Sequence, residues 1–158
     1  MAEVLEADQL EDTLKGRYLT FAVGKEVYGI EIQYVTEIIG LQQITAVPEL
    51  PEYISGIINL RGKIIPVMDM KSRFKRQFTE QNDRTCIIVI DILNHPLGLI
   101  VDSVEEVISI SDSEIVSSKE TNLSSNKFMK GIGKVDNNVK LLLDCTTLLT
   151  INESNNSF

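Results

Sequence analysis

Arg61 is the residue of this sequence best suited to recognition chemistry, because it stands in the run Asn59-Leu60-Arg61-Gly62 between two aliphatic segments. Branched side chains on both sides predict two strands joined at a tight turn, in which Gly62 can take a positive φ. A guanidinium at the tip of such a hairpin can bind carboxylates and carbonyl groups through its planar fork. Glu37 is a candidate ion-pair partner that would aim it. The simpler alternative is that a turn arginine is only solvated.

Catalytic chemistry has little support in the residue types and their spacing. His95, the one histidine, stands in an Asn-His-Pro segment, where a solvated turn residue is expected rather than a general base. The acidic pair Glu105-Glu106 falls on a predicted strand and therefore points to opposite faces. Cys86 and Cys145 lie in apolar runs without metal-ligand spacing, which indicates reduced, buried side chains. We therefore expect no catalytic residues, no metal site and no cofactor.

The net charge of −8 and the pI of about 4.7 argue against two classes of partner. Nucleic-acid binders present a basic face, and anionic membrane surfaces attract basic segments. The N-terminal segment is acidic and lacks a signal-peptide core, and no run of roughly 18 apolar residues is present for a membrane span. We therefore expect a cytoplasmic protein that binds no nucleic acid and does not insert into a membrane.

Strand signals dominate the chain between an acidic segment at 1–16 and a polar segment at 151–158, which we expect to be tails around a domain at 17–150. Pro66 has no amide hydrogen, so its strand is expected at a sheet edge or a bulge. The predicted strands are 18–23, 27–32, 57–60, 64–68, 85–93, 97–102, 104–110, 131–135 and 139–143. Short helical turns are predicted at 33–39, 70–74 and 146–149, a turn at 94–96, and a polar loop at 111–126.

The chain contains an internal repeat, because two blocks of residues recur at constant offsets of 69 and 75 positions. The matched pairs are Gly29 and Gly98, Val35 and Val104, Glu37 and Glu106, Gly56 and Gly131, and Asp69 and Asp144. Each copy holds about five strands, so we expect two pseudo-equivalent β-barrels packed on a shared hydrophobic seam. Features present in both copies are interpreted as structural, which makes Asp69 and Asp144 helix caps. Arg61 corresponds to Asp136, so the two copies differ in chemistry at this turn.

The sequence resembles the CheW-like domain family of bacterial chemotaxis coupling proteins in three segments, RYLTFAVGKEVYGIEIQYVTEI, PEYISGIINLRGKIIPVMDM and GLIVDSVEEVISI. The likeness covers about residues 15–150, and the NLRG turn before a proline-containing, β-branched strand is its most specific motif. It implies a mainly β fold of two five-stranded SH3-like β-barrels. It also implies a stand-alone, non-catalytic adapter that couples the cytoplasmic tips of chemoreceptors to the regulatory domain of the histidine kinase CheA.

The same resemblance assigns roles to single residues. The functional arginine of the family and its paired glutamate fall on Arg61 and Glu37, while Val35 and Gly56 match positions tied to receptor or kinase contact. The partner-binding residues predicted in this way, with two more from the turn, are Arg61, Glu37, Val35, Asn59, Gly56 and Gly62. The receptor tip is expected in the groove between the barrels. The alternatives are a signalling barrel that binds a small ligand in that groove, a small enzyme, and a nucleic-acid barrel disfavoured by charge.

Overall fold

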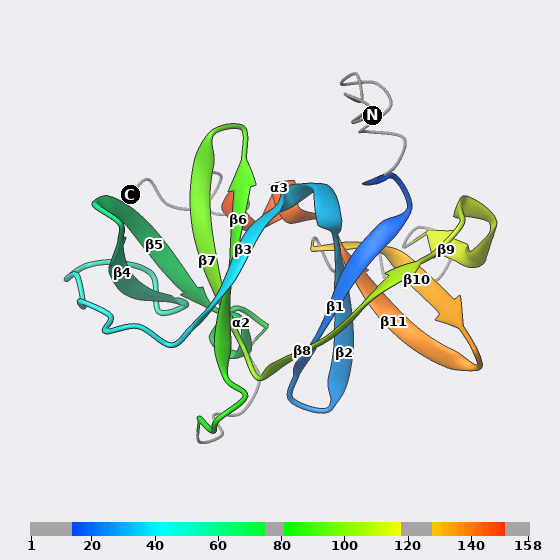
Figure 1. Ribbon diagram of the computed structural model, residues 1–158, viewed down its shortest axis with the longest axis horizontal. Coiled ribbons are helices and arrows are strands. Elements are labelled where there is room, and N and C mark those ends of the chain that lie inside the picture. The colour runs from blue at the N-terminus through cyan, green and yellow to red at the C-terminus, as the bar shows by residue number, and fades with distance from the viewer. Residues whose placement is uncertain (1–13, 75–80, 118–127, 151–158) are drawn as a thin grey trace, which may run out of the picture.

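The computed structural model describes residues 14–74, 81–117 and 128–150, and its strands form two sheets. Figure 1 shows these sheets as two lobes side by side, with short helices between them. The five-stranded sheet has the order β3-β6-β7-β5-β4. Its strands are β3 (Val35–Gly40), β4 (Ile54–Leu60), β5 (Lys63–Asp69), β6 (Cys86–Ile92) and β7 (His95–Val101).

The six-stranded sheet has the order β8-β1-β2-β11-β10-β9. Its strands are β1 (Arg17–Val23), β2 (Glu26–Glu31), β8 (Ser103–Ser109), β9 (Ile115–Ser117), β10 (Met129–Val135) and β11 (Asn138–Leu143). The helical elements are η1 (Ile32–Tyr34), η2 (Asp112–Glu114), α2 (Met70–Arg73) and α3 (Cys145–Thr150). The predicted mainly β fold of two similar lobes is confirmed, with β9 as a sixth strand that was not predicted. Closure of each sheet into a complete barrel stays a prediction.

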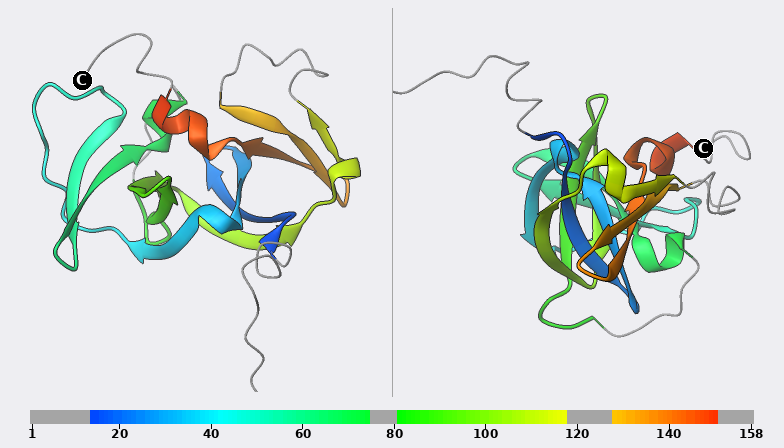
Figure 2. Two further views of the ribbon diagram at one scale, coloured as in Figure 1. Left: turned by 90° about the horizontal axis from the view of Figure 1, so that it is seen from above. Right: turned by 90° about the vertical axis from the view of Figure 1, so that its right-hand side faces the viewer.

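Each sheet combines strands from both copies of the repeat (Figures 1 and 2). The β1–β2 hairpin of the first copy pairs with β8 and β11, and the β6–β7 hairpin of the second copy pairs with β3 and β5. The two exchanges are in equivalent register, because Gly29 faces Leu142 and Gly98 faces Val67. The expectation that one copy makes one barrel is therefore wrong. Similar sequences cannot reveal an exchange of this kind, because equivalent strands offer the same pairing edge in both arrangements.

A shared hydrophobic cluster fills the junction of the lobes. It takes buried side chains from both hairpins and from both α-helices, among them Leu19, Phe21, Ile30, Met70, Ile88, Ile90, Leu99, Cys145 and Leu148. Phe21 and Ile90 are both 0% exposed, and burial of one such side chain stabilises the fold by about 1.5–3 kcal/mol. Smaller clusters lie inside each lobe, one around Ile58 and one around Ile110. The predicted seam is confirmed.

Arg73 of α2 joins the two copies across this seam. The residue is 9% exposed, and its guanidinium carbon lies 3.9 Å from the ring centroid of Tyr53 and 4.4 Å from that of Phe128. Tyr53 and Phe128 occupy equivalent positions in the repeat, since their carbonyl oxygens accept from the equivalent amides of Asp69 and Asp144. Burial lowers the pKa of Arg73, while the nearby Tyr53 opposes this change. Stacking on two rings offsets part of the cost of removing this cation from water.

Both α-helices begin at an aspartate cap, as predicted. The Oδ1 atom of Asp69 accepts from the amide of Lys71 at 3.0 Å, and Oδ1 of Asp144 accepts from the amide of Thr146 at 3.1 Å. Each carboxylate therefore satisfies an amide that has no partner within its helix. The predicted tail at 151–158 and most of the one at 1–16 lie outside the described residues. The first part of the polar loop predicted at 111–126 contains η2 and β9, and the rest of it, from residue 118, lies outside the described residues.

The helical turn predicted at 33–39 is largely wrong. η1 ends at Tyr34, and Val35 begins strand β3 at the edge of the five-stranded sheet. The pairing of β3 with β6 changes register between Val35 and Glu37. Burial still alternates along β3, but the half-buried position 37 holds a glutamate and the outward position 38 holds an isoleucine that is 46% exposed. The apolar residues Val35, Ile38 and Ile39 therefore show the spacing of a helix.

Two further predictions, one for a turn and one for the position of Pro66 in its sheet, also need correction. The turn between β6 and β7 is formed by Leu93 and Asn94, with φ values of 50° and 68°, while His95 and Pro96 belong to β7. Pro66 does not lie on an edge strand, because β5 pairs with both β4 and β7. Proline fits there because the pairing of β5 with β7 starts only at the next residue, Val67.

Candidate functional site

The β4–β5 turn presents Arg61 on a fixed backbone. Arg61 and Gly62 have φ values of 52° and 85°, as a two-residue type I′ turn requires. The amide of Gly62 donates to Oδ1 of Asn59 at 2.9 Å, which closes the turn from inside. Asn59 and Gly62 therefore act on Arg61 through the conformation of the turn. Direct contact of either residue with a partner stays a prediction.

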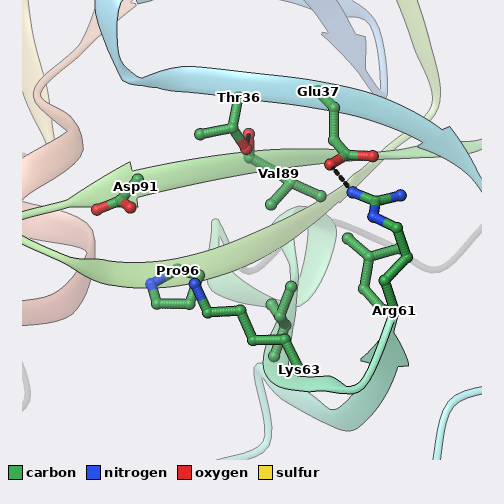
Figure 3. Close-up of a pocket in the computed structure, with 9 residues that line it drawn as sticks. Thr36, Glu37, Arg61, Lys63, Val89, Asp91 and Pro96 are labelled. Atoms are coloured by element: carbon green, nitrogen blue, oxygen red, sulfur yellow. Dashed lines mark hydrogen bonds and ion pairs between the residues drawn. The ribbon is translucent and has the colours of Figure 1, made fainter.

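Arg61 and Glu37 form the expected ion pair, from Nη2 to Oε2 (Figure 3). Glu37 lies on β3, the strand at one edge of the five-stranded sheet. Arg61 lies at the tip of the β4–β5 hairpin, which forms the other edge of that sheet. The side chain of Arg61 is 68% exposed and that of Glu37 is 31% exposed. Surface pairs of this kind contribute only about 0–1 kcal/mol to stability. The pair is thus better suited to holding a guanidinium toward a partner than to holding the fold.

The ion pair borders a surface pocket of about 300 Å³. Its apolar walls come from Leu60, Ile65, Val89 and Pro96. Lys63 and Asp91 also line it, and Figure 3 shows Lys63 reaching toward Pro96 at the end away from Arg61. Sequence reasoning missed these two charged residues. The signal was available, because the repeat aligns Lys63 with Asn138 and Asp91 with Ala22, so both differ between the copies as Arg61 does.

The equivalent turn in the other lobe has the same backbone and different chemistry. Asp136 and Asn137 have φ values of 49° and 66°, close to those of the Arg61 turn. An acidic residue therefore replaces the arginine on an equivalent scaffold. The positions that align with Ile65 and Val89 of the pocket wall are Lys140 and Thr20, which are polar. The site is a property of one lobe.

Val35 and Gly56 do not line the pocket. Val35 is half-buried against the shared cluster and pairs with Ile90. Gly56 has a φ of 150°, and a Cβ atom there would lie 2.2 Å from the carbonyl oxygen of Thr45. The structure thus gives both residues roles in packing, and their contact with a partner stays a prediction.

Other reactive groups of the described residues lie apart from this pocket. Burial raises the pKa of Cys145 to about 12, and nearby carboxylates act in the same direction. Burial also raises the pKa of Cys86, so neither thiol is a ready nucleophile near neutral pH. In residues 14–74, 81–117 and 128–150, no three His, Cys, Asp or Glu side chains gather as a metal site requires. No helix in this part of the chain is long and apolar enough to cross a bilayer.

Comparisons with known proteins agree on one family. The family model for the CheW-like domain matches residues 17–153. A chemotaxis protein CheW of Klebsiella aerogenes is 32% identical over 143 residues, which cover 90% of this chain and 86% of that protein. The corresponding protein of Bacillus subtilis is 33% identical over 138 residues, or 84% of this chain and 86% of the relative. A solved scaffolding protein CheW from Thermoanaerobacter tengcongensis is 39% identical, covers 82% of this chain and 88% of its own, and has a TM-score of 0.76.

Proposed function

The chain belongs to the CheW-like domain family of chemotaxis proteins, and we propose that it is an adapter that couples chemoreceptor cytoplasmic tips to the histidine kinase CheA. The observation that carries the proposal is the Arg61–Glu37 pair, exposed on a rigid turn beside a pocket whose arginine is replaced by Asp136 in the other lobe. A charge held in this way is prepared for a partner, because little ordering remains to be done on binding. Family membership supports other chemotaxis proteins as the partners.

The adapter acts without catalysis and without a cofactor in this proposal. It holds a receptor tip and the regulatory domain of the kinase in one assembly. A shift in the receptor then biases the kinase, provided that the adapter makes different contacts with the two states. Many copies in a receptor array add avidity, so each contact can be weak on its own. The protein works in the cytoplasm and reaches the membrane only through its partners.

Arg61→Ala tests this function in a reconstituted mixture of receptor fragments, CheA and the adapter. Receptor-dependent kinase activity is expected to fall by roughly tenfold, as loss of a central arginine at an interface commonly does. The melting temperature is expected to stay within about 2 °C of the wild type, since the lost ion pair is exposed. Asp136→Ala is the matched control, because it removes a charge from the equivalent turn of the other lobe. Full kinase activation by Arg61→Ala with normal melting would refute the role of this residue.

A charge exchange separates recognition from support of the fold. The double variant Arg61→Glu with Glu37→Arg can restore an ion pair with the opposite polarity. If the pair only holds the turn against β3, kinase activation returns in the double variant. If the guanidinium meets a partner, activation stays low although melting is normal. We expect the second result, because a fork placed on β3 no longer points from the hairpin tip.

A further inference from the structure

The pocket beside Arg61 carries a second pair of charges, Lys63 and Asp91, at its other end. Arg61 and Glu37 neutralise each other, whereas Lys63 and Asp91 make no ion pair with any residue in the described part of the chain. Lys63 is exposed at the start of β5, and Asp91 is half-buried on β6 opposite Pro96. Two unpaired charges of opposite sign therefore stand over an apolar wall whose half-buried members are Leu60 and Pro96.

The openness of this site favours a protein as its occupant. The Arg61 side chain on its rim is 68% exposed, so a small molecule in the pocket would keep much of its surface in water. Sites for small molecules commonly bury about 70–90% of the ligand surface. A protein surface, in contrast, covers the rim and excludes water from the charges. The pocket then fits an aliphatic side chain, and the rim fits the residues beside it.

We propose that Lys63 and Asp91 select the partner of this pocket. The partner places an aliphatic side chain against Leu60 and Pro96, an acidic residue toward Lys63, and a basic residue toward Asp91. This inference rests on the proposed adapter function, because the partner is one of the two proteins that the adapter joins. A protein that lacks the complementary acidic and basic residues would bury Lys63 and Asp91 without ion-pair partners, which disfavours the complex.

The other lobe provides an internal comparison. Its residues at the equivalent positions are Asn138 and Ala22, and the Asp136 turn replaces the arginine. The turn geometry is conserved between the lobes, while all three of these charges differ in type or are missing. The fold therefore does not need Lys63 or Asp91, and their presence in one lobe points to recognition.

Charge reversal in the full chain tests the proposal. Lys63→Glu and Asp91→Lys are compared with the wild type for binding to a receptor cytoplasmic fragment and to the CheA regulatory domain, at low and high salt. Each variant is expected to weaken binding to the same one of these partners by roughly tenfold at low salt, and by less at high salt. Lys134→Glu and Asp83→Lys are the controls, since they make equal charge changes at exposed positions outside the pocket. Controls are expected to bind within about twofold of the wild type.

The outcomes distinguish this proposal from the adapter function. If both reversals bind both partners as the wild type does, while Arg61→Ala binds weakly, Lys63 and Asp91 have no part in selection and the adapter function stands. If Arg61→Ala also binds both partners normally, the adapter function through this site fails too. Equal losses in the two controls would overturn the proposal by reducing the effect to net charge. Asp91→Asn, a smaller change, replaces Asp91→Lys if the latter melts early, and is expected to weaken binding by roughly threefold.

Discussion

Replacing Gly56 by alanine is expected to destabilise the fold, whatever its effect on partners. The added Cβ would lie 2.2 Å from the carbonyl oxygen of Thr45, and the φ of 150° strains any residue with a side chain. Relief of the clash requires the segment around Thr45 to move away from β4. That movement breaks two backbone hydrogen bonds between Thr45 and Ile57, each 2.9 Å long.

The magnitude follows from these two effects. Backbone strain of this kind costs about 1–3 kcal/mol, and each lost hydrogen bond costs about 0.5–1.5 kcal/mol. We therefore expect Gly56→Ala to lower the free energy of unfolding by about 2–6 kcal/mol. For a chain of this size, each kcal/mol lowers the melting temperature by about 2–4 °C, so the variant should melt roughly 10 °C early.

Gly62→Ala is the matched control for this measurement. Gly62 also has a positive φ, 85°, but a Cβ atom there meets nothing within 4 Å. Its substitution is expected to cost only about 1–2 kcal/mol from the left-handed backbone. Urea unfolding of both variants supplies the comparison. If Gly56→Ala is as stable as the wild type and yet binds its partners poorly, the packing account is refuted and direct contact by Gly56 is supported.

Three further predictions concern buried or capped groups. Burial opposes the charge on Lys130, but its bonds to Glu31 and Tyr18 outweigh burial and raise its pKa. The stabilisation of the fold by Lys130 is therefore complete below the unfolded-state pKa of about 10.4 and is lost as the pH rises through the folded-state pKa. In urea unfolding, Lys130→Met should therefore reduce the fall in the free energy of unfolding at alkaline pH. Cys145, with its pKa of about 12, should react with a thiol reagent near neutral pH only as fast as the protein opens; rapid labelling that Cys145→Ser abolishes would contradict this. Asp144→Ala should lower the free energy of unfolding by about 0.5–2 kcal/mol through loss of the α3 cap, with an unchanged midpoint as the contrary result.

Local signals predicted the parts of the fold that depend on local chemistry. Asp69 and Asp144 could be assigned as caps because a carboxylate before a short helix has one clear use. The Arg61 turn was found because glycine between two branched runs marks a hairpin. The residue pattern alone made Arg61 and Glu37, 24 positions apart, only candidates for an ion pair. The family resemblance was needed to predict that they form one.

Features that depend on distant contacts were missed. The edge strand β3 was mistaken for a helical turn because Glu37 takes a half-buried position to meet Arg61 while Ile38 is exposed, which removes the apolar alternation that identifies a strand. Lys63 and Asp91 come together only because β5 and β6 lie on either side of β7, and no spacing in the sequence records this. Leu93 is 84% exposed in a turn with a positive φ, a position where sequence rules expect glycine or asparagine.

The exchange of hairpins makes the two halves of the molecule mutually dependent. A fragment ending after β5 would hold the β1–β2 hairpin without β8 or β11, and the remaining fragment would hold β6–β7 without β3 or β5. Neither piece can complete a sheet, so two such fragments should regain structure only by threading into one another. Folding must also wait for strands far apart along the chain to meet, which slows it. In return, each lobe is joined to the other by the chain connections from β2 to β3 and from β7 to β8, and by the shared hydrophobic cluster, so a force on one lobe also acts on the other.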